Sequence, residues 1–176
     1  LFILGVTVLA WQVGGWRVAS LCFLGLIFML VTGIWPQTMR SVYLCGAAVS
    51  LSFFVGAAIG IWAALNDRAS AFIRPINDTL QTMPLFVFLI PVIMFFQVGD
   101  FPALLAIIMY AIVPSIRYTE HGIRHVRADI VEAARMQGCT RGQILWRVQL
   151  PLALPEIALG LNQTIMFGLA MVVIDA

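Results

Sequence analysis

The stretch that decides the expected fold is EAARMQGCTRGQILWRVQLP, residues 132–151, a polar and Arg-rich segment between two strongly apolar ones. It reads Glu132-Ala133-Ala134, three residues, Gly138, nine residues, then Val148-Gln149-Leu150-Pro151. A long ordered loop at one face of the bilayer indicates a specific role in a membrane protein. We interpret this stretch as a docking element for a partner protein.

The composition around this stretch is that of a membrane protein. Hydrophobic residues make up 62% of the 176 residues and charged residues 10%, against roughly 25% charged residues in soluble domains. Several runs approach or exceed the ~18–20 apolar residues that cross a bilayer core of roughly 30 Å. The net charge of +2 is too small to indicate nucleic-acid binding. The sequence therefore predicts an all-α polytopic membrane protein.

About five to six spanning segments are expected. They are a remnant at 1–10, then spans at 18–34, 41–65, 83–98 and 103–116, and a last span from 152 onward. A link with two Trp residues at 11–17 is typical of a headgroup boundary. The chain begins with Leu and stops inside an apolar run, so we interpret 1–176 as one transmembrane domain cut from a longer protein.

The arginines predict the orientation of the chain. Arg17, Arg68, Arg74 and the six arginines from 117 to 147 fall on one face, and only Arg40 falls on the other. By the positive-inside rule, the polar loop at 117–151 is cytoplasmic.

Within the loop, we expect two short helices with a break between them. Asp129 followed by Glu132 predicts a capping-box start, and Gly138 supplies the permissive backbone that ends the first helix. Thr140 followed by Gln143 predicts a second capping box. It opens a helix with Ile144, Leu145 and Val148 on one face, and Pro151 marks the return to the membrane. Caps alone would explain Glu132 and Gly138, but not the nine-residue gap to Val148.

The loop spacing resembles the EAA loop of permease subunits in binding-protein-dependent ABC importers. Further runs are similar to permeases of glycine betaine/proline betaine uptake systems: 81–84, 89–92, 122–124, 148–153, 160–164 and 171–174. The similarity covers roughly 35–174. Two departures are Arg127, where relatives often have Pro, and Asp175, where many relatives have a small apolar residue.

This resemblance implies a type I ABC importer permease fold in the bacterial or archaeal plasma membrane. It implies an external solute-binding protein, two permease copies as a homodimer, and two cytoplasmic ABC ATPase subunits that receive the loops. The implied coupling residues are Glu132, Ala133, Ala134, Gly138, Thr140, Val148, Leu150 and Pro151. Whether the solute is glycine betaine, proline betaine, choline, carnitine or proline stays open, since these systems differ mainly in the binding protein.

The chain has no lysine, so the phosphate-binding sequence of a P-loop ATPase cannot be built from it. Any ATP chemistry must lie on a partner chain, and we expect no enzymatic activity, cofactor or metal here. His121 and His125 have metal-ligand spacing, but only Glu120 is near as a third ligand.

Alternatives are an importer permease for an amino acid or taurine, a passive channel, or a membrane-embedded enzyme. The enzyme would need paired acids at one membrane depth. Glu156 and Asp175, the acids of the last span, lie ~30 Å apart on an ideal helix.

Polar residues inside the spans are candidates for the translocation path. Asn162, Gln163 and Thr164 lie in the last span, where amides face protein or a water-filled path. Path lining and helix–helix hydrogen bonding both remain open for them. Pro84 and Pro91 weaken backbone hydrogen bonding and serve either gating or packing. Gly56 and Gly60 form a small-xxx-small face suited to close helix packing.

Overall fold

A computed structural model describes residues 2–97 and 99–175, and every element in those ranges is a helix. The all-α prediction is confirmed. The chain divides into two compact units, unit 1 at 1–43 and unit 2 at 44–176. Leu1, Val98 and Ala176, which belong to the predicted segments at 1–10, 83–98 and 152 onward, lie outside the described residues.

Unit 1 contains α1 (Phe2–Val31) and the first turns of α2 (Trp35–Leu65). The link predicted at 11–17 is helical apart from one kink at Gly15, whose φ of 73° and ψ of −175° are not helical. A turn at Gly33, with φ 77°, joins α1 to α2. Phe2 and Trp35 meet edge to face with ring centroids 6.2 Å apart.

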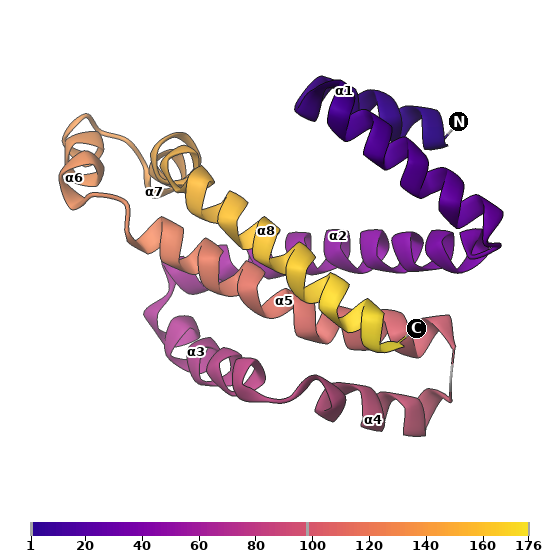
Figure 1. Cartoon of the computed structure of the whole chain (residues 1–176). Coiled ribbons are helices and arrows are strands. Elements are labelled where there is room, and N and C mark those ends of the chain that lie inside the picture. Colours follow the sequence, from indigo (N-terminus) through magenta and orange to yellow (C-terminus); the bar gives the residue numbers. More distant parts are fainter. Residues whose placement is uncertain (1, 98, 176) are drawn as a thin grey trace. The chain divides into compact units, whose positions relative to one another are not determined.

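Unit 2 holds the rest of α2 and the elements that follow it (Figure 1). These are α3 (Asp67–Thr82), α4 (Leu85–Phe96), α5 (Asp100–Arg124), α6 (Ala128–Met136), α7 (Arg141–Ile144), the π-helical turn η1 (Leu145–Gln149) and α8 (Leu150–Asp175). Among the described residues, four helical segments are long and apolar enough to cross a membrane: α1, α2, α5 and the continuous run Arg141–Val173. This number is close to the expected five to six.

The segment predicted to span at 83–98 behaves differently from a single spanning helix. Its helix α4 has 12 residues, about 18 Å at 1.5 Å per residue, and is too short to cross alone. It follows α3 after a break at Met83 and Pro84, both with extended backbone. Ser70 of α3 bonds Glu120 of α5, and Asn77 bonds the Val113 carbonyl. Therefore α3 runs antiparallel to α5, and α4, which follows α3 in the chain, also contacts α5.

Close contacts at glycines hold α2 against α5. A Cβ built on Gly56 would lie 2.7 Å from the Ser115 Cβ, and one on Gly60 would lie 2.8 Å from the Ile116 carbonyl oxygen. Only hydrogen atoms fit at these positions, so the small-xxx-small prediction is confirmed. The hydroxyl of Ser115 also donates to the Phe53 carbonyl at 3.0 Å.

The same device holds α8 antiparallel along α5 (Figure 1). Gly122 faces the Cβ of Glu156, and Gly160 faces the Cβ of Tyr118, at 2.7 and 2.8 Å from ideal Cβ positions. Farther along α5, the ring of Tyr110 stacks on that of Phe167 in α8, with ring centroids 4.8 Å apart. The packing core of unit 2 is thus α2, α5 and α8, and the polar end of α5 leads directly into α6.

The polar loop predicted at 117–151 is less irregular than expected. Its first eight residues continue α5 to Arg124, and the segment from Arg141 joins α8 without a break. The reason at the α5 end is burial, since Thr119, Glu120 and Ile123 all face neighbouring helices.

Candidate functional site

The short helix α6 presents one face to solvent and one to the protein. Glu132 and Ala133 are exposed, whereas Ala134 is buried on the side where α6 contacts α7 and η1. The small alanine side chains leave the exposed backbone open to close approach by another surface. The structure thus presents the predicted docking residues Glu132 and Ala133 outward, with Ala134 as their anchor.

The end of α6 is a Schellman motif at Gly138. The Cys139 amide donates to the Ala134 carbonyl at 3.2 Å, and the Gly138 amide donates to the Arg135 carbonyl at 2.9 Å. Gly138 has φ +79°, a left-handed conformation that side chains with a Cβ disfavour. The predicted role of Gly138 as the end of the first helix is confirmed.

The predicted capping box at Asp129 and Glu132 is wrong. The helix begins two residues earlier than that box requires, with Arg127 as N-cap and no side-chain cap. The Asp129 carboxylate instead binds Arg127 at 2.5 Å and accepts from the Ile130 amide at 3.0 Å. Arg127 therefore binds the Asp129 carboxylate, which the predicted box would have used to cap the helix.

The second capping box forms as predicted. The Thr140 hydroxyl accepts from the Gln143 amide at 3.4 Å, and the Gln143 side chain accepts from the Thr140 amide at 2.9 Å. Ile144 and Leu145 are buried, and Val148 is half-buried. This cap fixes where the chain turns from α6 toward the membrane.

The helix then continues through Pro151 instead of restarting there. Pro151 is the second residue of α8 and is exposed. It has no amide hydrogen, and its ring crowds the carbonyl four residues earlier. The preceding turn is widened: Leu150, half-buried, donates its amide to the Leu145 carbonyl five residues back. Such single π turns inside α-helices are rare and are frequent at functional sites.

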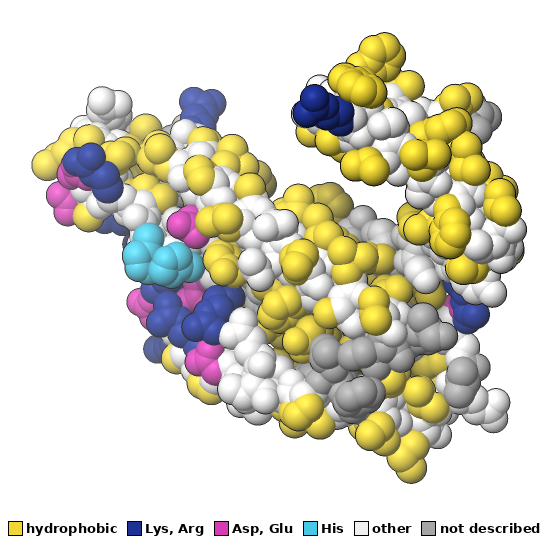
Figure 2. Space-filling model, in the orientation of Figure 1, with side chains coloured by type: hydrophobic (Ala, Val, Ile, Leu, Met, Phe, Trp, Pro, Cys, Tyr) yellow, Lys and Arg dark blue, Asp and Glu magenta, His cyan; other side chains and the backbone are white. Residues whose placement is uncertain are grey.

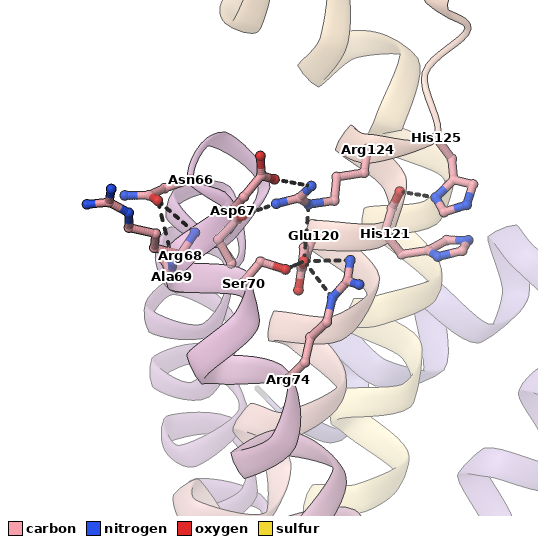
Figure 3. Close-up of polar contacts among 11 residues, drawn as sticks. Asn66, Asp67, Arg68, Ala69, Ser70, Arg74, Glu120, His121, Arg124 and His125 are labelled. Atoms are coloured by element: carbon pink, nitrogen blue, oxygen red, sulfur yellow. Dashed lines mark hydrogen bonds and ion pairs between the residues drawn. The ribbon is translucent and has the colours of Figure 1, made fainter.

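An ion cluster at the end of α5 was not predicted (Figure 3). The Glu120 side chain is only 6% exposed. Its Oε1 accepts from the Ser70 hydroxyl at 2.5 Å and from Arg74 Nε at 3.0 Å. Arg124 Nε lies 3.2 Å from the same oxygen without hydrogen-bond geometry. Two guanidinium groups thus compensate one desolvated carboxylate.

Arg124 extends this cluster to the corner between α2 and α3. Its Nη2 donates to the Ala63 carbonyl, one of the last of α2, and its Nη1 binds Asp67, each at 2.8 Å. Asn66 caps α3 by accepting from the Arg68 amide at 3.0 Å. The corner is therefore tied to α5 a few residues before α6 begins. The only signal in the sequence was an acid among arginines in an otherwise apolar chain.

His121 and His125 stack with ring centroids 3.7 Å apart at the exposed end of α5 (Figure 3). The His125 Nδ1 lies 2.9 Å from the His121 carbonyl oxygen. Glu120, the third metal ligand considered, is occupied by arginines. Within 2–97 and 99–175, no three His, Cys, Asp or Glu side chains gather as a metal site would require.

The candidate path residues do not share one environment. Asn162 is exposed and Gln163 half-buried, while Thr164 is fully buried with its hydroxyl on the Gly160 carbonyl of its own helix at 2.8 Å. Pro84 and Pro91 are exposed at the start and middle of α4. The side chain of Asp175 lies outside the described residues.

A family model described as "Binding-protein-dependent transport system inner membrane component" matches residues 56–174. The chain is 42% identical over 166 residues to the glycine betaine/proline betaine transport system permease protein ProW of Escherichia coli K12, covering 94% of the chain and 47% of that protein. It is 40% identical over 168 residues to the glycine betaine transport system permease protein OpuAB of Bacillus subtilis, covering 96% and 60%. It is also 42% identical over 177 residues to the trimethylamine N-oxide transport system permease protein TmoV of Ruegeria pomeroyi, covering 99% and 27%.

The chain therefore spans roughly half the length of the first two relatives, at 47% and 60%. Among solved structures, an inward-facing methionine ABC transporter, MetNI, matches with a TM-score of 0.68 over 84% of the chain and 73% of the solved chain. The sequence identity is 20%, so this likeness shows the fold alone, that of an ABC importer permease.

Proposed function

This chain belongs to the binding-protein-dependent transport system inner membrane component family, and from that membership we propose that it is the permease of an ATP-driven importer of betaine-like solutes. The relatives named above are permease proteins for glycine betaine, proline betaine and trimethylamine N-oxide. These solutes share a methylated, positively charged nitrogen and a negatively charged oxygen. The sequence identities of 40–42% support the same solute class here.

The observation that carries the proposal is the geometry of α6. Glu132 and Ala133 point outward from a nine-residue helix whose buried Ala134 ties it to the start of the last span. The Schellman motif at Gly138 and the capping box at Thr140 fix the direction of α6 relative to α8. A force applied by a partner at Glu132 is therefore transmitted to a membrane-spanning helix through ordered backbone. This is what an ATPase-coupling loop needs.

The partners of such a permease are an ABC ATPase, an extracytoplasmic solute-binding protein and a second copy of the permease, with 117–151 facing the cytoplasm. The ATPase would receive α6 in a surface groove and supply the ATP chemistry, leaving this chain a transport subunit. We place the path at the face of α8 that carries Asn162, because an exposed amide in a spanning helix is unfavourable against lipid. The whole chain, 1–176, would act as one transmembrane domain.

The test is uptake of labelled glycine betaine by bacteria that lack their own osmolyte uptake systems. The cells express the full-length parent protein with its ATPase and binding protein, as wild type, Glu132→Arg or Gly138→Val. We expect uptake in wild type, and in both variants normal membrane insertion with loss of coupling between ATP hydrolysis and uptake. Gly142→Ala is the matched control, because Gly142 is helical and open space surrounds its Cβ position.

Each alternative gives a different result. Uptake of another solute, such as an amino acid or taurine, with betaine ignored keeps the permease and changes its substrate. Flux that persists without ATP or the ATPase indicates a passive channel. Normal ATP-driven uptake in both loop variants contradicts the coupling role of α6.

A further inference from the structure

A polar cavity lies between three helices at the arginine-rich end of unit 2. Its volume is about 470 Å³, and its walls come from α3, α5 and α8. The lining residues are Gln81, Arg117, Tyr118, His121 and Glu156. This volume falls within the roughly 300–1,000 Å³ of small-molecule sites. Histidine side chains lie exposed on this face, with basic and acidic side chains beside them (Figure 2).

Glu156 is the unusual member of this lining. It is half-buried in the first turns of α8, and it has no hydrogen-bond or ion-pair partner among the described residues. The Cβ of Glu156 would lie 2.7 Å from a Cβ at Gly122, so Glu156 lies at the point where α8 packs most closely against α5. An ionisable residue on a spanning helix that faces a cavity indicates function, because an unpaired charge there is unfavourable.

The lining of the cavity carries both charges, a carboxylate at Glu156 and a guanidinium at Arg117. Glu156 and the ring of Tyr118 are the two groups that a methylated ammonium prefers, since it has no N–H to donate. Arg117 binds Asp78 and Gln81 through Nη1 alone. A guanidinium has five N–H donors, so Arg117 retains donors for an anionic oxygen.

A second cavity of about 360 Å³ shares Arg117 and His121 with the first. Its lining holds two acids. Glu120 is engaged by Ser70, Arg74 and Arg124, and Asp78 is paired with Arg117 at 3.3 Å. Neither carboxylate can take a cation without breaking one of these ion pairs. The charges therefore favour the cavity with Glu156 as the ligand site.

We propose that the cavity between α3, α5 and α8 binds a small zwitterion with a methylated ammonium group, the ammonium at Glu156 and Tyr118 and the anionic oxygen at Arg117. The inference rests on the proposed function, because betaines and trimethylamine N-oxide are zwitterions of this class. It adds a binding site on the permease itself, at the end that carries the coupling loop. Solute bound there is held on the cytoplasmic side, independently of the external binding protein.

The experiment is equilibrium binding of labelled glycine betaine to the purified full-length permease–ATPase complex without the binding protein. The complex is placed in phosphatidylglycerol nanodiscs, which contain no zwitterionic headgroup. We expect saturable binding that tetramethylammonium competes away. Glu156→Gln and Tyr118→Leu should each weaken betaine binding by about tenfold or more, as loss of a charged or cation–π contact does. Asp129→Asn, which neutralises an exposed acid in α6, should bind like wild type.

Saturable binding lost in Glu156→Gln, with ATPase activity and gel-filtration behaviour retained, supports the site. No saturable binding, in a complex that imports betaine once the binding protein is added, overturns the site and leaves the proposed function standing. If the complete system imports no betaine, the proposed function fails whatever the variants do. Phosphatidylcholine retained by wild type but not by Glu156→Gln, with no betaine binding, identifies a lipid headgroup as the occupant and also overturns the proposal.

Discussion

The buried ion cluster at Glu120 leads to a quantitative prediction for Glu120→Gln. Loss of one partner from a buried ion pair typically destabilises by about 3–5 kcal/mol. The value here should be smaller, because Arg74 is 59% exposed and can turn to water. Arg124, 25% exposed, keeps its bonds to Asp67 and to the Ala63 carbonyl, and the Ser70 hydroxyl can still donate to the glutamine oxygen. We therefore expect a loss of about 2 kcal/mol.

The assay uses a cysteine that the fold buries. Cys45 is buried in α2, whereas Cys22 and Cys139 are partly exposed, so the background is Cys22→Ser/Cys139→Ser. In detergent, a thiol reagent labels Cys45 only when the protein opens. A loss of about 2 kcal/mol makes labelling about 30-fold faster.

The control is Asp129→Asn, which removes an ion pair whose side chains are 76% and 60% exposed. Exposed pairs contribute about 0–1 kcal/mol, so its labelling rate should change little. If Glu120→Gln labels no faster than Asp129→Asn, then the cluster does not stabilise the corner between α2 and α3, and the reasoning fails.

Three further predictions concern two glycines and one helix cap. Gly60→Ala should lower the melting temperature of the purified protein, because the new Cβ would lie 2.8 Å from a backbone oxygen of α5. The control Gly46→Ala, on the same helix, meets open space and should leave the melting temperature unchanged. Equal melting temperatures for the two variants would exclude close α2–α5 packing. Gly138→Ala should speed limited proteolysis between α6 and α7 by about tenfold, because a side chain in the left-handed conformation adds about 1–2 kcal/mol of strain. The control Gly142→Ala has open space and a helical backbone, and it should leave the proteolysis rate unchanged. Identical digestion of the two variants would refute the turn geometry. Thr140→Ala should raise amide hydrogen exchange in α7 by the loss of about 1 kcal/mol of capping, and unchanged exchange would show that the cap is dispensable.

Features that depend on a few neighbouring residues were predictable from the sequence. The end of α6 at Gly138 and the cap at Thr140 and Gln143 each involve contacts within five residues. The capping box expected at Asp129 was wrong for an equally local reason, since Arg127 lies two residues away and binds the acid. A capping pattern states which bonds are possible, and a competing cation decides which one forms.

Helix α3 shows where hydropathy stopped being informative. No helix was expected at 67–82, and the face that α3 buries against α5 is polar, with Ser70 and Asn77 bonded to α5. The same contacts explain why α5 continues past 116, since Glu120 is buried against α3. Long apolar runs indicate segments that contact lipid. Helix α3 and the end of α5 contact each other through polar groups instead, so hydropathy does not detect them.

The sequence by itself determined that the chain is a helical membrane protein, which face carries the arginines, and where an exposed loop with ordered ends lies. Only the tertiary structure brought Ser70 and Arg74 to Glu120, across 50 and 46 residues of chain, and Gln81 and Glu156 to the wall formed by Arg117. The physical reason is range. Helix formation, capping and partition into lipid act on each segment separately, whereas a charge finds its partner only after the glycine contacts of α2, α5 and α8 have set how closely the helices approach.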